Sequence, residues 1–170
     1  MGDKKIGLYL ANQLGFSETG RIALNIFIIT KLEQIGYKVW EPFREGAKYL
    51  DIEHINSLNT YEERRKAFAI ANQKIARNNI IMPSKSKVMA PILDGGHSVD
   101  DGVAGELGEY YARGYGPIIA LRTDFRLSEN IGCLVNLQLE KYIKKSGGKI
   151  CASMNEWYAK LERVYKQLKK

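Results

Sequence analysis

One short segment holds an unusual number of groups that can do nucleophilic or acid–base chemistry. Residues 93–108 carry four carboxylates, Asp94, Asp100, Asp101 and Glu106, among five glycines. Carboxylates held close together raise one another's pKa, and two of them in different environments can serve as a nucleophile and a general acid/base. The glycines leave room for a ligand to approach the backbone. The segment therefore indicates chemistry centred on a carboxylate.

Glu106 is the candidate nucleophile of this segment. Asp100 or Asp101 can cap the helix predicted to follow, and Glu106 would lie about one turn inside it, where the helix dipole favours the ionised form that a nucleophile needs. Periodicity alone favours a plainer alternative. In that interpretation Glu106 is a solvated charge on the polar face of the helix, next to an ion pair between Glu109 and Arg113.

Common metal and cofactor motifs are missing from the sequence. Counted from Asp94, an EF-hand loop would need Gly where Val99 stands and Glu where Gly105 stands, and the glycine spacing over residues 102–108 is not a dinucleotide fingerprint. The cysteines and histidines are isolated, without metal-ligand spacing: Cys133, Cys151, His54 and His97. We therefore expect no metal, no organic cofactor and reduced cysteines.

Strands and helices are predicted to alternate along the chain. Short apolar runs predict strands over residues 6–11, 37–40, 88–93, 117–121 and 149–152. Helical spacing predicts helices over residues 17–36, 61–79 and 102–114, another ending at Ser146-Gly147-Gly148, and a last one after Ser153. The pattern predicts a single α/β domain over residues 1–170, with a doubly wound parallel sheet of about five strands and helices on both faces.

Two of the predicted helices carry clear signals at their ends. Ser17 or Thr19 is expected to cap the first helix, which should end at Gly36. Its expected buried stripe is Ile22, Ile26, Ile29 and Leu32. Pro83 is expected to end the helix over residues 61–79, which a polar loop should precede.

The loops that leave the carboxyl ends of parallel strands build the ligand crevice of such a fold. Three loops rich in polar residues and glycine should meet there: residues 12–19, 94–101 and 122–130.

Charge and hydropathy exclude some classes of partner. Residues 141–170 contain nine Lys or Arg and two Asp or Glu, so this tail accounts for the whole net charge of +7 and reads as a solvated helix face rather than a nucleic-acid site. No apolar run reaches the roughly 20 residues that cross a bilayer. Residues 1–5 show no signal-peptide pattern, and Ile6 breaks the myristoylation pattern. We expect a cytoplasmic protein that binds neither nucleic acid nor membrane.

Two segments resemble the nucleoside 2-deoxyribosyltransferase family. The first is Tyr9-Leu10-Ala11 followed by Leu14-Gly15-Phe16-Ser17, and the second is Leu93-Asp94-Gly95 leading to Asp100-x-Gly102-x-x-x-Glu106-x-Gly108. The likeness extends from Tyr9 to about Asn136. It implies a flavodoxin-like fold, a place in nucleotide salvage, and homo-oligomers in which a neighbouring subunit completes each active site.

The resemblance also implies roles for individual residues. Glu106 matches the nucleophile, Asp100 the carboxylate six residues before it, and Tyr9 the tyrosine that orients the nucleophile. Asn136 matches an asparagine that reaches the site from a neighbouring subunit, with Asn130 as a rival.

Further positions are expected to contact the substrate: Asp94, Gly15, Phe16 and Gly102.

The chain departs from the family pattern at two places. Asn12-Gln13 stands where Gly-Pro is common after the first strand, which could alter the contacts with base or sugar. Residues 84–87, Ser-Lys-Ser-Lys, stand where many members have an Asp before Leu-Asp-Gly. That loss leaves Asp100 or Asp94 to protonate the base.

The resemblance implies base exchange on 2′-deoxynucleosides by double displacement at C1′, with free nucleobases as co-substrates and net retention. One alternative is an N-glycoside hydrolase of (deoxy)nucleoside 5′-monophosphates, with the phosphate held near Ser86 and Lys87 or by Ser98. Another is a non-catalytic nucleotide-binding module on the same fold.

Overall fold

The computed structural model describes residues 5–170, so Met1–Lys4, on which part of the targeting expectation depends, lie outside the described residues. The strands are β1 (Gly7–Tyr9), β2 (Lys38–Trp40), β3 (Val88–Met89), β4 (Ile119–Leu121) and β5 (Lys149–Cys151). The helices are η1 (Leu14–Phe16), α1 (Glu18–Ile22), η2 (Ala23–Ile29), α2 (Thr30–Ile35), α3 (Pro42–Gly46), α4 (Ile52–Ser57), α5 (Tyr61–Ser84), α6 (Asp101–Ala112), α7 (Leu137–Lys145) and α8 (Met154–Leu168).

All strand pairs are parallel, as predicted, but the strands form two small sheets. β1 lies between β2 and β3, and β4 pairs with β5. Isolated bridges, Met89 to Ile118 and Ile92 to Leu121, connect the two sheets. The strand predicted over residues 88–93 shrinks to two residues because Pro91, in its middle, has no N–H to donate to a ladder.

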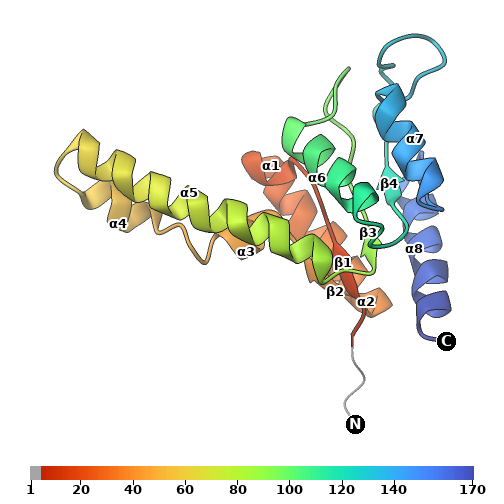
Figure 1. Cartoon of the computed structure of the whole chain (residues 1–170), viewed down its shortest axis with the longest axis horizontal. Helices are drawn as coiled ribbons and strands as arrows, with labels where there is room; N and C mark the ends of the chain where they lie inside the picture. Colours follow the sequence, from red (N-terminus) through yellow and green to blue (C-terminus); the bar gives the residue numbers. More distant parts are fainter. Residues whose placement is uncertain (1–4) are drawn as a thin grey trace.

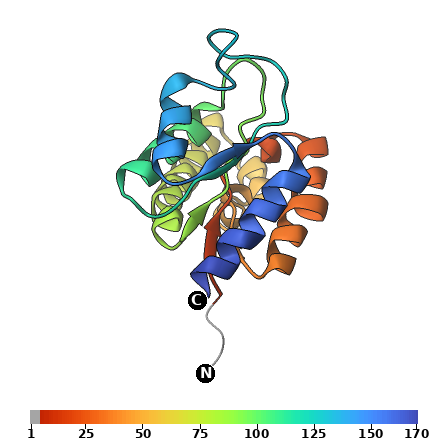
Figure 2. The same cartoon turned by 90° about the vertical axis from the view of Figure 1, so that its right-hand side faces the viewer.

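Helices cover both faces of the strands, as the alternation predicted (Figure 2). One face packs against the helix formed by α1, η2 and α2 and against α8, with a core that includes Leu24, Ile28, Leu32, Trp157 and Leu161. The other face packs against α5, α6 and α7, with a core that includes Met82, Leu107, Tyr110, Leu139 and Ile143. Two apolar cores therefore hold the strand ends, and the loops leaving them, in fixed positions.

The first long helix has the predicted ends and half of the predicted buried face, since Ile29 and Leu32 are buried as expected. The Ser17 hydroxyl accepts a hydrogen bond from the Gly20 N–H, and Gly36 adopts a left-handed φ of 118° at the other end. Ile22 and Ile26 are 50% and 59% exposed, so the expected stripe was wrong in its first half. The middle of the helix, η2, has the wider π-helical turn, which rotates later side chains relative to 3.6-residue spacing.

The segment expected to be a polar loop before the second long helix contains α3 and α4 instead. Pro42 opens α3 in the position where its missing N–H costs nothing. A capping box between Thr60 and Glu63 starts α5, which runs to Ser84, one residue past the proline expected to end it. Figure 1 shows α4 and the first half of α5 projecting from the body as an arm, while the second half of α5 packs beside α6.

Two findings concern the whole of residues 5–170. No helix in this range has both the length and the apolar character needed to span a bilayer. Cys133 and Cys151 are buried and unpaired, as expected.

Candidate active site

A pocket of about 630 Å³ lies at the carboxyl ends of β1 and β2, beside the start of α6. Its described lining residues all fall between positions 12 and 106: Asn12, Gly15, Phe16, Arg21, Pro42, Phe43, Gly46, Ala47, Leu50, Ile52, Ile75, Asn79, Asp100, Gly102, Val103 and Glu106. The walls are mostly apolar, with Asp100 and Glu106 as the acidic groups. The pocket therefore combines an apolar surface with two carboxylates.

The Glu106 side chain is largely removed from solvent, and this burial raises its pKa from 4.5 to about 7. The Tyr9 hydroxyl opposes the shift, while the charges of Asp100, Glu41 and Glu109 add to it. The expectation that the helix dipole would leave Glu106 favouring its ionised form was wrong, because the effect of burial is larger. Glu106 is the sixth residue of α6, beyond the first turn where the dipole acts strongly. The alternative of a solvated charge was also wrong, although Glu109 does pair with Arg113 at 3.6 Å.

Tyr9 lies fully buried at the end of β1, opposite Glu106. Its hydroxyl makes no hydrogen bond of standard distance and angle within the described chain. It nevertheless interacts with the Glu106 carboxylate, and burial together with that negative charge raises the pKa of Tyr9. The phenol therefore stays protonated and is available as a donor to Glu106.

Asp100 and two glycines shape the mouth of the pocket. The Asp100 Oδ1 accepts a hydrogen bond from the Val103 N–H at 3.1 Å and so caps α6. A Cβ at Gly102 would lie 3.1 Å from that same oxygen, so glycine leaves the carboxylate its space. A Cβ at Gly15 would lie 2.1 Å from the Phe43 ring, so only glycine lets this ring close the wall.

Phe16 and Phe43 form an aromatic corner of the pocket. Their ring centroids are 4.7 Å apart in an edge-to-face arrangement, yet Phe16 remains 74% exposed. An exposed aromatic side chain beside an apolar cavity is suited to stacking on a ligand or a second chain.

Asp94 is occupied by the third loop of the crevice. Its carboxylate accepts hydrogen bonds from the Thr123 N–H at 2.6 Å, the Thr123 hydroxyl and the Asp124 N–H at 2.9 Å. The Gln13 amide also donates to the Asp94 carbonyl. These contacts bring the three predicted loops together at one edge, and Asp94 is not among the described residues that line the pocket.

Asn136 caps α7 in this chain. Its Oδ1 accepts from the N–H groups of Gln138 and Leu139, and its Nδ2 donates to Glu129. The rival Asn130 holds the N–H of Gly132 within the same loop. Neither lines the pocket of its own chain, and a role of Asn136 in a neighbouring subunit's site stays a prediction.

The segment considered for phosphate binding lies at the wrong end of the sheet. The Lys87 N–H pairs with the Gly7 carbonyl where β1 begins, opposite the edge that bears Glu106. Ser86 is 2% exposed, and its hydroxyl donates to the Met82 carbonyl. A phosphate site there was a wrong expectation. Ser98, the other phosphate candidate, is exposed in the loop before α6 and does not line the pocket.

Sequence reasoning missed three polar side chains of this region. Arg21 is the only cationic side chain among the described lining residues. The side-chain oxygen of Asn79, Oδ1, on α5 is buried without a hydrogen-bond partner in the described chain. Glu41, after β2, is a buried carboxylate. A lone acid before Pro42 and an asparagine in a helix give no motif, so only the fold reveals them.

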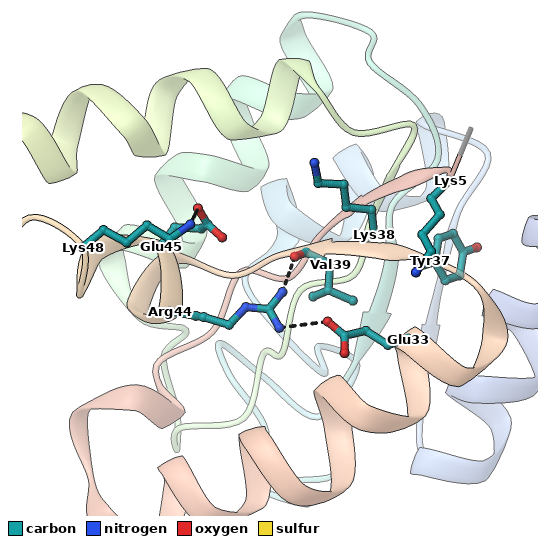
Figure 3. Close-up of a pocket in the computed structure, with 8 residues that line it drawn as sticks. All are labelled: Lys5, Glu33, Tyr37, Lys38, Val39, Arg44, Glu45 and Lys48. Atoms are coloured by element: carbon teal, nitrogen blue, oxygen red, sulfur yellow. Dashed lines mark hydrogen bonds and ion pairs between the residues drawn. The ribbon is translucent and has the colours of Figure 1, made fainter. Parts of the chain in front are cut away.

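A second hollow lies on the other side of α3, lined in part by Lys5, Lys38 and Lys48 (Figure 3). Arg44 there donates to the Glu33 carboxylate at 2.8 Å and to the Val39 carbonyl. Lys48 pairs with Glu45. These contacts tie α3 to α2 and β2, and they give this hollow a structural role.

A sequence model of the family described as nucleoside 2-deoxyribosyltransferase matches residues 8–139. The chain belongs to this family. The match includes both segments that carry Tyr9, Asp100 and Glu106, together with every residue that lines the pocket.

Solved structures of nucleoside 2-deoxyribosyltransferases share the fold. A 2-desoxiribosyltransferase from Leishmania mexicana is 19% identical, with a TM-score of 0.63 over 93% of this chain and 97% of that one. A 2-deoxyribosyltransferase from the psychrotolerant bacterium Bacillus psychrosaccharolyticus is 21% identical, with a TM-score of 0.55 over 91% of this chain and 95% of that one. A comparison with curated protein sequences gave no match.

Proposed function

We propose that this member of the family is a nucleoside 2-deoxyribosyltransferase that exchanges the base of 2′-deoxynucleosides through a covalent deoxyribosyl–Glu106 intermediate, with retention at C1′. The observation that carries the proposal is the Glu106 carboxylate, which lies half-buried in a mostly apolar pocket and faces Tyr9 and Asp100. A carboxylate anion that is poorly solvated is less stable, and this makes it a better nucleophile toward C1′.

The reaction has two displacements. In the first, an ionised Glu106 oxygen bonds to C1′ as the C1′–N bond breaks, and the Asp100 carboxyl gives its proton to the leaving base. In the second, a nitrogen of the incoming base bonds to C1′, the ester bond to Glu106 breaks, and Asp100 takes the proton back. The Tyr9 hydroxyl holds the attacking oxygen in place. Asp94 is proposed no longer as a rival acid, because the Thr123–Asp124 backbone occupies it.

The substrate is proposed to lie along the pocket with its sugar near Gly15 and Gly102 and its base against Phe43 and Ile75. These apolar walls can cover the faces of a heterocycle. The Asn79 amide stands at the base end as a specificity group.

The test is base exchange with purified protein and Glu106 variants. A labelled deoxynucleoside and a second free base should yield the exchanged nucleoside with its β configuration kept. Glu106→Ala should lose this activity by at least roughly 10³-fold. A Glu106→Ala protein that exchanges bases at the wild-type rate overturns the proposal.

A second candidate is hydrolysis of nucleoside 5′-monophosphates, and Arg21 is the observation that favours it. A guanidinium at the pocket can pair with a phosphate. Release of sugar phosphate, with no exchange when free base is added, would favour this candidate. Tight binding with neither reaction would indicate a non-catalytic module.

We also propose that residues 1–170 form one flavodoxin-like domain that acts in the cytoplasm as a homo-oligomer with shared active sites. Phe125 and Ile131, 92% and 94% exposed on the loop before Asn136, support this because large apolar groups favour burial against another chain. Mixed subunits carrying Asn136→Ala and Glu106→Ala should regain part of the activity. Monomers at assay concentration with full activity would exclude shared sites.

A further inference from the structure

Glu41 is a buried carboxylate that connects two walls of the pocket. It is 1% exposed. Its Oε1 accepts hydrogen bonds from the Asn12 Nδ2 at 2.9 Å and the Phe43 N–H at 3.1 Å, and its Oε2 accepts from the Arg44 N–H at 2.6 Å. All three contacts are donors, which the anionic form satisfies best. A negative charge is therefore held inside the protein by a dedicated set of partners.

Helix capping alone does not explain this residue. α3 is only five residues long, and Ser, Thr or Asn would cap it without burying a charge. The third donor, Asn12, comes from the loop after β1, 29 positions earlier in the chain. Because Asn12 and Phe43 both line the pocket, Glu41 joins the two loops that form its walls.

Asn12 is fully committed to this arrangement. Besides its bond to Glu41, its Nδ2 donates to the Leu10 carbonyl at 3.1 Å, and its Oδ1 accepts from the Leu14 N–H at 3.0 Å. Its neighbour Gln13 holds the other side of the crevice through the Asp94 carbonyl. Glu41 therefore accepts a hydrogen bond from one of the two residues that depart from Gly-Pro, and both Nδ2 hydrogens of Asn12 are used within the fold.

The far end of the connection is fixed as well. Arg44, whose N–H is held by Glu41, is tied through its guanidinium to Glu33 and to the Val39 carbonyl (Figure 3). A movement of Glu41 would therefore have to displace α3 from α2 and β2.

The charge of Glu41 also reaches the nucleophile. The titratable groups that face Glu106 are Tyr9 at the end of β1, Asp100 before α6, Glu109 on α6 and Glu41 after β2. Tyr9 lowers the pKa of Glu106, whereas the negative charges of the other three raise it. Glu41 differs from Asp100 in lying outside the described pocket lining.

We propose, on the basis of the function proposed above, that Glu41 is a positioning residue for base exchange: through Asn12 it fixes the loop after β1 against α3, and its charge keeps the Glu106 carboxylate reactive. Like charge beside an anion makes that anion less stable and a better partner for an electrophilic carbon. Glu41 itself touches no substrate and transfers no proton.

Two variants separate the two effects. Glu41→Gln keeps the length of the side chain and one oxygen for Asn12 but removes the charge, so the acidic limb of the kcat/KM profile should move to lower pH by roughly 0.5 unit. Asn12→Ala keeps the charge but frees the loop, so this limb should stay in place while KM rises by roughly threefold or more. Glu45→Gln is the control and should change neither, because Glu45 lies on the same helix, pairs with Lys48 and is absent from the described pocket lining.

An unmoved limb in Glu41→Gln, or a wild-type KM in Asn12→Ala, overturns the proposal. If Glu41→Gln does not fold, Asn12→Ala still decides whether Glu41 positions the loop after β1, and a wild-type KM there overturns the proposal. If the wild-type protein exchanges no bases, the proposed function is refuted rather than the role of Glu41. The effect of the Glu41 charge on Glu106 is then measured from free energies of unfolding. The difference in free energy of unfolding between proteins with Glu106 and with Glu106→Gln depends on pH, and this dependence should change when both also carry Glu41→Gln. An unchanged dependence refutes the interaction between the two charges.

Discussion

Glu106 should make the folded protein less stable above neutral pH. Its pKa is raised from 4.5 to about 7, so between these values the folded state binds more protons than the unfolded state. Stability therefore falls as pH rises through this window, and the whole penalty is present above it. A shift of this size corresponds to about 3 kcal/mol, an upper value because the side chain is not fully buried.

Glu106→Gln tests this directly, because the amide has nearly the same shape and no charge. At pH 4.5 or below, the variant and the wild type should have similar free energies of unfolding. At pH 8 the variant should be more stable by up to about 3 kcal/mol while lacking base exchange. Urea unfolding followed by the fluorescence of the buried Trp157 measures the difference.

Groups that titrate in the same way in wild type and Glu106→Gln contribute nothing to the difference between their free energies of unfolding. Asp124, for example, has its pKa held far below its usual value by Arg126, and its stabilising effect is lost at low pH in both proteins alike. Glu109→Gln is the matched control on the same helix, since this residue is half-buried and paired with Arg113. A stability difference between Glu106→Gln and wild type that is constant from pH 4.5 to 8 would refute the electrostatic account of the nucleophile.

Three further outcomes are expected. Tyr9→Phe should lower kcat roughly 10- to 100-fold and move the acidic limb of the kcat/KM profile to higher pH, because the hydroxyl lowers the pKa of Glu106; an unmoved limb contradicts this. Asp100→Asn keeps the oxygen that caps α6, so its melting temperature should match the wild type while kcat/KM falls roughly 10²- to 10⁴-fold. Asn79→Leu removes a buried side-chain oxygen without a partner, so the free energy of unfolding should rise by about 1 kcal/mol. KM for the nucleoside should rise as well. A wild-type KM would show that Asn79 does not contact the base.

The order of strands and helices was readable because each element carries a local signal. Ser17, Gly36 and Ser153 mark helix ends by the same hydrogen bonds and left-handed turn that the structure contains. The sequence predicted the buried side chains of the first helix only at Ile29 and Leu32, because a prediction that assumes 3.6 residues per turn cannot include the π-helical turn of η2. The helices α3 and α4 were missed because they are too short to show periodicity.

The sequence predicted those residues of the candidate site that lie close together in the chain or at the end of a predicted strand. Asp100, Gly102 and Glu106 lie within seven residues, and Tyr9 ends a strand whose neighbours fix its direction. The environment of Glu106 was not readable, because burial comes from packing between distant elements and it outweighs the helix dipole. Asp94 stayed an alternative to Asp100 in the sequence, and only the fold shows that the loop at residues 122–124 occupies its carboxylate.

All described pocket residues lie between Asn12 and Glu106 in the sequence. This separation affects which substitutions the chain can accumulate. The segment after Glu106 supplies much of both cores, including Trp157, Leu161 and Ile143, but none of the described lining. Substitutions that are far apart and share no partners add nearly independently. Residues 12–106 can therefore be varied to retune substrate choice, while stabilising changes accumulate in the remaining part to offset what those substitutions cost.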